Sequence, residues 1–146
     1  MSLKKAYTDF WRRYFDFKGY SSRKAYWTPT LIHILVAIIL GIALILCDVS
    51  DISWVVFTMV TIVVLFSISL IIPQLALQVR RLHDINRKGF LVYVNLILGI
   101  ATNFAHEGSA LFNILNIVTF ILSVWLFVYM LFRTQDHVEP EQRRWV

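Results

Sequence analysis

Cysteine is nearly absent from this chain of 146 residues, because Cys47 stands alone. A lone cysteine excludes an intrachain disulfide, and it leaves no Cys/His cluster of the kind that holds zinc. The sequence also has no phosphate-binding glycine loop, no nucleophile elbow and no paired carboxylates within its apolar runs. These absences remove the common sequence signatures of hydrolases, nucleotide-binding enzymes and metalloenzymes. A cleavable signal peptide is not expected either, since the first 25 residues are aromatic and charged.

Acidic residues are few, with nine Asp and Glu against 14 Lys and Arg, and charged residues make up only 16% of the chain. Hydrophobic residues make up 58% and the mean hydropathy is +0.67, whereas an ordinary soluble domain has about 45–50% apolar residues. A water-soluble protein of this size could not bury so much apolar surface. The composition therefore predicts an integral membrane protein.

Four long apolar runs carry this excess, at residues 27–47, 52–77, 90–105 and 110–132. A helix needs about 20 residues at about 1.5 Å each to cross a bilayer core of about 30 Å. The third run has about 16 residues and would reach about 24 Å. It could cross a thinned bilayer, or enter and return within protein. We expect a full crossing, because the distribution of charge requires it.

All 14 Lys and Arg residues fall into three segments, with seven before the first run, four between the second and third, and three after the fourth. The two other connections hold three acidic residues and no basic one. Basic residues are retained on the cytoplasmic side of a membrane. We therefore expect an all-α protein in a single membrane domain, residues 1–146, with four transmembrane helices in a bundle. Both termini, and the tail at 133–146, are expected in the cytoplasm.

Residues 3–18 predict a separate amphipathic helix. Its aromatic and apolar face recurs at steps of three or four residues, and most charged residues fall on the opposite face. Such a helix can lie in the membrane interface or pack on the cytoplasmic face of the bundle, and the sequence leaves both open. Gly19 then ends the helix, and Ser21 or Ser22 can cap the first span. The apolar face consists of Leu3, Tyr7, Phe10, Trp11, Tyr14 and Phe17.

Each apolar run also carries small or polar residues on one face. Helices in lipid associate through small residues and side-chain hydrogen bonds, so these faces predict the interior of the bundle. The alternative is a polar cavity or conduction path, for which His33 is the best candidate as an ionisable group within a span. No acidic residue lies within a run to complete a proton relay. The other polar candidates are Asn95, Asn113 and Asn116.

The charged segment at residues 78–90 reads QVRRLHDINRKGF. Pro73, just before it, frees a backbone carbonyl about one turn earlier and is expected to kink the second span. The helix should continue past the membrane surface, where Arg80 and Asp84 are four residues apart and can pair. Asn86 or Gly89 can end it. The arginines are expected to pair with Asp84, with backbone carbonyls or with lipid phosphates.

Two stretches of the chain resemble a known family. Arg80 to Asp84 reads RRLHD, residues 87–90 read RKGF, and residues 15–27 read FDFKGYSSRKAYW. Together with Pro73, these residues resemble the motifs of the domain-of-unknown-function 805 (DUF805) family of bacterial inner-membrane proteins. The resemblance implies a location in the bacterial cytoplasmic membrane and brings no activity or cofactor with it.

Tyr20, Ala25 and Phe90 depart from the family pattern, which usually has Arg, Glu and Trp at these places. The change at Ala25 matters most. If that acid normally pairs with the arginines of the RRLHD motif, its partner is missing here. The tail at 135–146 also lacks the family's usual glycine- and asparagine-containing ending.

Three classes of function fit these patterns. The first is a structural or interaction protein that contacts anionic lipid headgroups, a membrane-protein partner or further copies of itself. Each basic residue near an anionic surface adds about 1 kcal/mol, and Arg suits phosphate through its forked donors. The residues expected to bind lipid or a partner are Arg23, Trp27, Arg80, Arg81, His83, Asp84, Arg87 and Lys88.

The second class is a small-solute transporter or channel formed by several copies, since four spans leave little room for a pore in one chain. The third is a membrane-surface enzyme that uses His83 and Asp84. One His and one Asp supply too few ligands for a metal, which usually needs three or more. No metal or other cofactor is expected. Nucleic acid is not expected as a partner either, because the basic residues follow the cytoplasmic edge of the membrane.

Overall fold

The chain is all-helical over residues 2–49 and 53–132, the part that the computed structural model describes. It forms five helices there: α1 (Leu3–Arg12), α2 (Arg23–Val49), α3 (Ser53–Asp84), α4 (Phe90–Phe104) and α5 (Ala110–Leu131). By length and composition, α2, α3 and α5 could each cross a membrane, whereas α4 has only 15 residues. These apolar helices confirm a multi-pass membrane protein, and the short third run is a single short helix.

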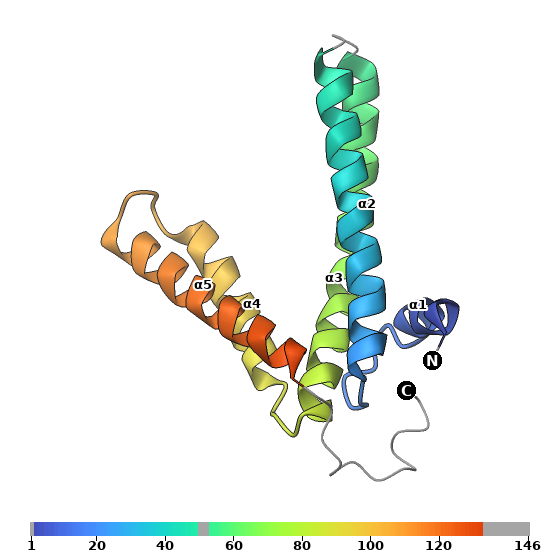
Figure 1. The fold of residues 1–146 in the computed structure, drawn as a ribbon. Coiled ribbons are helices and arrows are strands. Elements are labelled where there is room, and N and C mark those ends of the chain that lie inside the picture. Colours follow the sequence, from blue (N-terminus) through green and yellow to red (C-terminus); the bar gives the residue numbers. More distant parts are fainter. Residues whose placement is uncertain (1, 50–52, 133–146) are drawn as a thin grey trace.

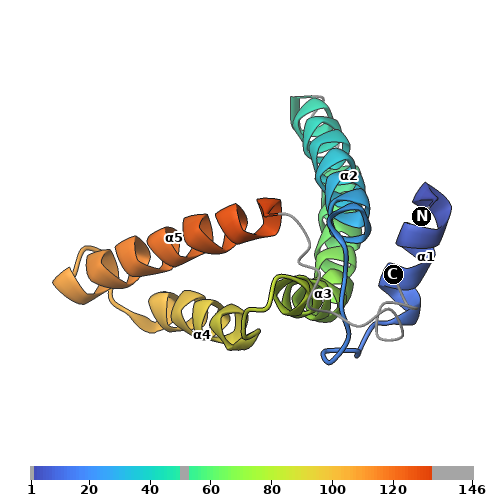
Figure 2. The same ribbon diagram turned by 60° about the horizontal axis from the view of Figure 1, so that its bottom comes forward.

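Helices α2 to α5 form two antiparallel hairpins. Helix α2 runs beside α3, α4 runs beside α5, and the two pairs diverge like the arms of a V (Figure 1). They meet only at one end, where α3 ends and α4 begins (Figures 1 and 2). The expected single bundle is therefore not what the structure shows. Gly41 and Gly99 lie on the small-residue faces, and a Cβ at either would meet nothing within 4 Å.

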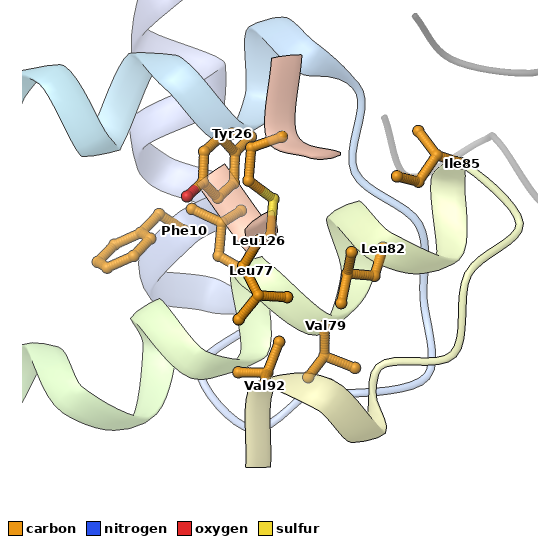
Figure 3. Packing of buried hydrophobic residues seen from close by; sticks show 9 residues of the cluster. Phe10, Tyr26, Leu77, Val79, Leu82, Ile85, Val92 and Leu126 are labelled. Atoms are coloured by element: carbon orange, nitrogen blue, oxygen red, sulfur yellow. The ribbon is translucent and has the colours of Figure 1, made fainter. Parts of the chain in front are cut away.

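The protein core lies where the arms meet. Every helix contributes to it, and the last turns of α3 lie in the middle of the cluster (Figure 3). Beyond this end the arms expose large apolar side chains, for example Ile38 at 54%, Leu65 at 63% and Ile121 at 61%. Such exposure is expected of helices whose solvent is lipid. The core consists of Phe10, Tyr26, Leu77, Val79, Leu82, Ile85, Val92, Leu126 and Met130.

Helix α1 is shorter than the predicted 3–18, because it ends at Arg12. Asp16 diverts the chain: its carboxylate pairs with Arg13 at 2.6 Å and accepts the amides of Lys18 and Gly19, both at 3.1 Å. A side chain that binds nearby amides offers the backbone an alternative to the helix. The buried residues of α1, Ala6 and Phe10, pack on protein rather than lipid.

The other helix ends follow the sequence closely. The Ser22 hydroxyl accepts from the amide of Ala25 at 3.4 Å and caps α2. At the end of α3, Asn86 has a positive φ of 57°, and its amide donates to the His83 carbonyl at 3.0 Å. The Arg87 amide donates to the Leu82 carbonyl at 2.9 Å. These two bonds form a Schellman motif, so Asn86 is the residue that ends α3.

Pro73 frees a carbonyl within α3, as predicted, and a side chain from the N-terminal segment binds it. Proline has no amide hydrogen, so the carbonyl four residues earlier, that of Ser69, loses its helical donor. The Tyr14 hydroxyl donates to this carbonyl at 2.8 Å. This bond attaches the turn after α1 to the side of α3.

Candidate functional site

The arginines of the RRLHD motif lie inside the protein, next to the core. Arg80 and Arg81 are 1% and 0% exposed, and Asp84 is 1% exposed. We call these three residues the arginine junction. The structure thereby corrects the expectation that Arg80, Arg81 and Asp84 contact lipid headgroups, because none of them reaches the surface. Buried charges are tolerated only where they are paired and hydrogen-bonded.

Arg81 connects three segments of the chain. Its Nε donates to the carbonyl of Met130 at 3.4 Å, its Nη2 to that of Phe132, and its Nη1 to that of Ser21 at 3.5 Å. The first two carbonyls belong to the last turn of α5, which has no helical donors for them. A cation there also favours the negative end of the helix dipole. Arg81 therefore ties α3 to the end of α5 and to the start of α2.

Asp84 neutralises this arginine. Its carboxylate pairs with Nη1 of Arg81, three residues earlier. The predicted alternative, a pair between Asp84 and Arg80, is not formed. The carbonyls around Arg81 carry only partial charges, so the carboxylate of Asp84 adds a full negative charge beside the guanidinium.

Arg80 is the less satisfied member of the junction. Its Nε donates to the carbonyl of Ala76 at 3.3 Å, whereas its Nη2 has no hydrogen-bond partner among the described residues. Arg80 lines a cavity of about 10 Å³ together with Asp9 and Ala25, which is room for about one water. Asp9 and Asp16 stabilise its charge at longer range, and Arg13 opposes it. Ala25, the position at which the resemblance led us to expect Glu, lines the same cavity as Arg80.

Trp27 and Arg23 were both expected to contact lipid or a partner, but Trp27 packs within the protein and Arg23 is exposed. The indole Nε1 of Trp27 donates to the Met130 carbonyl at 3.3 Å, and its ring meets Phe127 edge-on at 5.8 Å. Trp27 therefore helps to dock α5 on α2. Arg23 is exposed in the first turn of α2.

His83 points away from Asp84. Its Nδ1 lies 3.4 Å from the carbonyl of Gly19, and its ring lies 6.4 Å from that of Tyr20. The two neighbours thus have different partners and do not form an acid/base pair. Within the described residues, no group of three or more His, Cys, Asp or Glu could hold a metal. His83 orders the loop before α2.

A basic pocket opens beside His83. It has a volume of about 510 Å³, within the usual range for small-molecule sites. Three exposed cations, Lys18, Arg87 and Lys88, contribute to it, and no carboxylate from the described part of the chain does. The guanidinium of Arg87 lies 5.3 Å above the ring of Tyr129. The lining residues are Lys18, Tyr20, His83, Asn86, Arg87, Lys88 and Gly89.

Close packing holds the loop of Arg87 and Lys88 against α3 on one side of this pocket. A Cβ on Gly89 would lie 2.5 Å from Cγ1 of Val79, so only glycine lets the loop approach α3 here. Lys18 and Tyr20 form the other wall, and neither was among the expected site residues. They lie far from Arg87 in sequence, and their place in the FDFKGYSSRKAYW motif was the only available signal.

An ion pair and two hydrogen bonds to backbone amides, all made by Asp16, stabilise the turn that carries Lys18. Partial burial raises the pKa of Asp16, but the hydrogen bond and charge of Arg13 and the amides of Lys18 and Gly19 outweigh this effect. The pKa of Asp16 therefore lies below its usual value of 3.8. The Asp16 carboxylate is therefore ionised at neutral pH, and its ion pair with Arg13 stabilises the turn.

The polar residues of the apolar helices do not converge on one path. His33 is surrounded by the rings of Tyr7, Phe10, Trp11 and Phe66, at centroid distances of 5.7, 4.8, 6.5 and 6.2 Å. It belongs to the contact between α1 and the first hairpin.

The asparagines lie in the second hairpin, away from His33. The Ser123 hydroxyl donates to Asn95 at 3.2 Å and joins α5 to α4. Asn113 and Asn116 are exposed on α5, and Asn116 donates to the Phe112 carbonyl of its own helix at 3.0 Å. Asn95 and Ser123 also line a cavity of about 220 Å³ where the hairpins meet, together with Tyr26 and Gln78.

Comparison with known proteins places the chain in a family. No curated protein and no solved structure matches it. The family described as protein of unknown function (DUF805) matches residues 14–140. That range includes the arginine junction and the whole lining of the basic pocket. Because the match covers most of the sequence, the chain belongs to the DUF805 family.

Proposed function

We propose that this protein is a four-span protein of the bacterial inner membrane whose basic pocket binds the phosphate groups of anionic lipids. Both termini and the pocket face the cytoplasm. The protein acts as a structural or interaction protein at that membrane surface. The observation that carries the proposal is the convergence of Lys18 with Arg87 and Lys88 in one pocket, whose lining among the described residues includes no carboxylate.

The distribution of charge supports this orientation. Residues 25–79 and 89–132 contain no Lys or Arg. The starts of α2 and α4 and the ends of α3 and α5 all lie at the end where the hairpins meet (Figure 1). An excess of basic residues at one end of a set of spans marks the cytoplasmic side. Helix α4, with 15 residues, reaches about 22 Å and crosses where the bilayer is thinned.

The pocket is chemically suited to phosphate. Arg87 offers a planar fork of donors, and Lys18 and Lys88 offer compact charges. Each basic residue near an anionic membrane surface adds about 1 kcal/mol to the attraction. The buried arginines contribute no such contact, so the lipid-binding set is Lys18, Arg87 and Lys88 in place of Arg80 and Arg81.

Native mass spectrometry of the purified protein tests the proposal. The protein is equilibrated with mixtures of phosphatidylglycerol and phosphatidylethanolamine, and the bound lipids are counted. The variant Lys18→Ala/Arg87→Ala/Lys88→Ala should lose its preference for phosphatidylglycerol at least about tenfold, since three contacts of about 1 kcal/mol each are removed. The control Lys4→Ala/Lys5→Ala/Arg12→Ala removes the same charge from exposed positions outside the pocket. Equal losses in both variants would refute a specific site.

A transporter or channel formed by several copies is the second candidate. The cavity lined by Tyr26, Gln78, Asn95 and Ser123 supports it, because it places uncharged polar groups between the two hairpins. Solute flux into vesicles that contain the reconstituted protein measures this activity. A transporter predicts a flux that falls in the variant Asn95→Leu, and a trace equal to that of empty vesicles excludes it.

A further inference from the structure

The basic pocket continues into an exposed apolar stripe on α4. Lys88 and Gly89 line the pocket, and Phe90 follows them directly. On the other wall Phe17 precedes Lys18, and its ring lies 6.2 Å from that of Tyr93. Exposed side chains then recur at steps of three or four along α4. This α4 stripe consists of Phe90, Tyr93, Ile97, Ile100 and Phe104, which are 62%, 38%, 64%, 51% and 86% exposed.

The α4 stripe indicates whether the ligand is a lipid or a water-soluble phosphate compound. A water-soluble ligand would use the pocket and leave the stripe bare. A lipid would use both, with its charged head in the pocket and its acyl chains along the apolar residues. Residues spaced at three and four along a helix form one continuous face, so a chain can follow the stripe from Phe90 towards Phe104.

The charge of the pocket indicates how many phosphates the head carries. Lys18, Arg87 and Lys88 supply three positive charges, and none of the lining residues within 2–49 and 53–132 is acidic. A phosphodiester carries one negative charge and would leave two cations without a counter-charge. Asn86, Tyr20 and His83 add further hydrogen-bonding groups around the same space. Basic pockets between helices at the cytoplasmic face are suited to multiply charged headgroups.

We propose that the basic pocket binds the headgroup of a lipid with two phosphate groups, and that its acyl chains lie along the α4 stripe. This inference rests on the proposed function and names the ligand of the same site. One phosphate contacts the Arg87 and Lys88 side of the pocket, and the other contacts Lys18. Once one phosphate is bound, the second is held at a high effective concentration. A two-phosphate lipid therefore binds more tightly than two separate one-phosphate lipids.

The test compares lipids at equal total charge. The protein in detergent is titrated with cardiolipin, which has two phosphodiesters, and with twice the molar amount of phosphatidylglycerol, which has one. Bound lipid is counted by native mass spectrometry. We expect about tenfold or greater preference for cardiolipin, in the range that linked contacts provide. The preference should disappear in Lys18→Gln and in Arg87→Gln/Lys88→Gln, since each removes one of the two phosphate contacts.

Soluble diphosphate and a charge-matched variant complete the test. Inorganic pyrophosphate should not displace bound cardiolipin, because it cannot use the stripe. Lys4→Gln/Lys5→Gln should keep the preference. Equal binding of the two lipids per charge, with both lost in the pocket variants, would overturn the two-phosphate inference and keep the proposed function. Displacement by pyrophosphate would show a soluble ligand. Binding that does not depend on lipid charge would overturn both proposals.

Discussion

Single side chains hold the junction of the two hairpins together, and Arg81 has the largest role. It donates to carbonyls of two segments and pairs with a carboxylate that is itself 1% exposed. Removal of one partner from a buried ion pair leaves an unpaired charge in the protein interior, which costs about 3–5 kcal/mol. The stability of this protein is therefore expected to depend on Arg81 far more than on any exposed basic residue.

Arg81→Ala should lower the free energy of unfolding by about 3–5 kcal/mol, and Arg81→Ala/Asp84→Ala should recover part of this loss because no buried carboxylate is then left unpaired. Arg87→Ala is the control, since Arg87 is exposed and such surface changes usually stay within about 0.5 kcal/mol, plus up to about 1 kcal/mol for its contact with Tyr129. Thermal unfolding in detergent measures the difference. Similar midpoints for Arg81→Ala and Arg87→Ala would contradict the assigned role.

The unpaired Nη2 of Arg80 leads to a second prediction. Ala25→Glu places a carboxylate beside the cavity that Arg80 lines, whereas Ala25→Gln places a neutral group of the same size there. The cost of the added volume is shared, so the comparison isolates the charge. The Glu variant should be the more stable by about 1–3 kcal/mol, the usual value of a hydrogen bond to a charged group. Equal unfolding midpoints would show that Arg80 is satisfied by another group.

Asp16 gives the turn after α1 a dependence on pH. Its pKa is lower in the folded protein than the usual 3.8. A depressed pKa stabilises the fold above the unfolded value, and this contribution is lost as the pH falls through the folded value. The stability difference between the protein and Asp16→Asn should therefore be constant from about pH 7 to pH 5 and should shrink below about pH 4. It should stay below about 1 kcal/mol, because the pair is partly exposed.

Unfolding at a series of pH values measures that difference. Glu107→Gln serves as the control, since Glu107 is exposed in the connection between α4 and α5 and is not part of this turn. If the difference in free energy of unfolding between the protein and Asp16→Asn grew as the pH fell, the lowered pKa of Asp16 would be contradicted.

Individual helices are ended by specific residues, and the end of α3 matters most because it forms a wall of the basic pocket. Asn86 has a φ of 57°, which glycine and asparagine adopt readily and β-branched residues do not. Asn86→Gly should therefore leave the stability close to that of the protein. Asn86→Val should cost about 1–3 kcal/mol and should also weaken lipid binding, because the loop of Arg87 and Lys88 is displaced. An unchanged Asn86→Val variant would contradict the Schellman motif.

The molecule as a whole is expected to lie with the junction of its hairpins in the cytoplasm. In a Cys47→Ser background, Arg87→Cys should react with a membrane-impermeant thiol reagent only after lysis of spheroplasts. Glu107→Cys, in the connection between α4 and α5, should react in intact spheroplasts. The physical reason is that all Lys and Arg residues are excluded from the far connections. Labelling of Arg87→Cys from outside would overturn the orientation, and labelling of both positions from one side would overturn the crossing of α4.

The arrangement of the arms was the least predictable feature. Hydropathy identifies helices that prefer lipid, but lipid is as apolar as the helices themselves, so no strong force selects how two hairpins pack. The small faces at Gly41 and Gly99 predicted close packing, but no atom of the described residues outside the glycine's own helical neighbourhood lies within 4 Å of a Cβ placed on either glycine. The same limit applies to the basic pocket. Arg87 and Lys88 could be recognised as exposed cations, whereas Lys18 joined them only when the loop before α2 was placed against α3.

Composition and local pattern are sufficient for the membrane-type helices and for the carbonyl that Pro73 frees, because these depend on nearby residues and on the preference of apolar side chains for lipid. The sequence limited the cap of α2 to Ser21 or Ser22 and the end of α3 to Asn86 or Gly89, and the structure selects Ser22 and Asn86. The burial of Arg80 and Arg81, the choice of Arg81 as the partner of Asp84, and the end of α1 at Arg12 required the folded chain. The residues next to an arginine in the sequence do not indicate whether its guanidinium is exposed or buried. Its position follows from carbonyls some 50 residues away, at the end of α5, which only the packing of distant segments brings within reach.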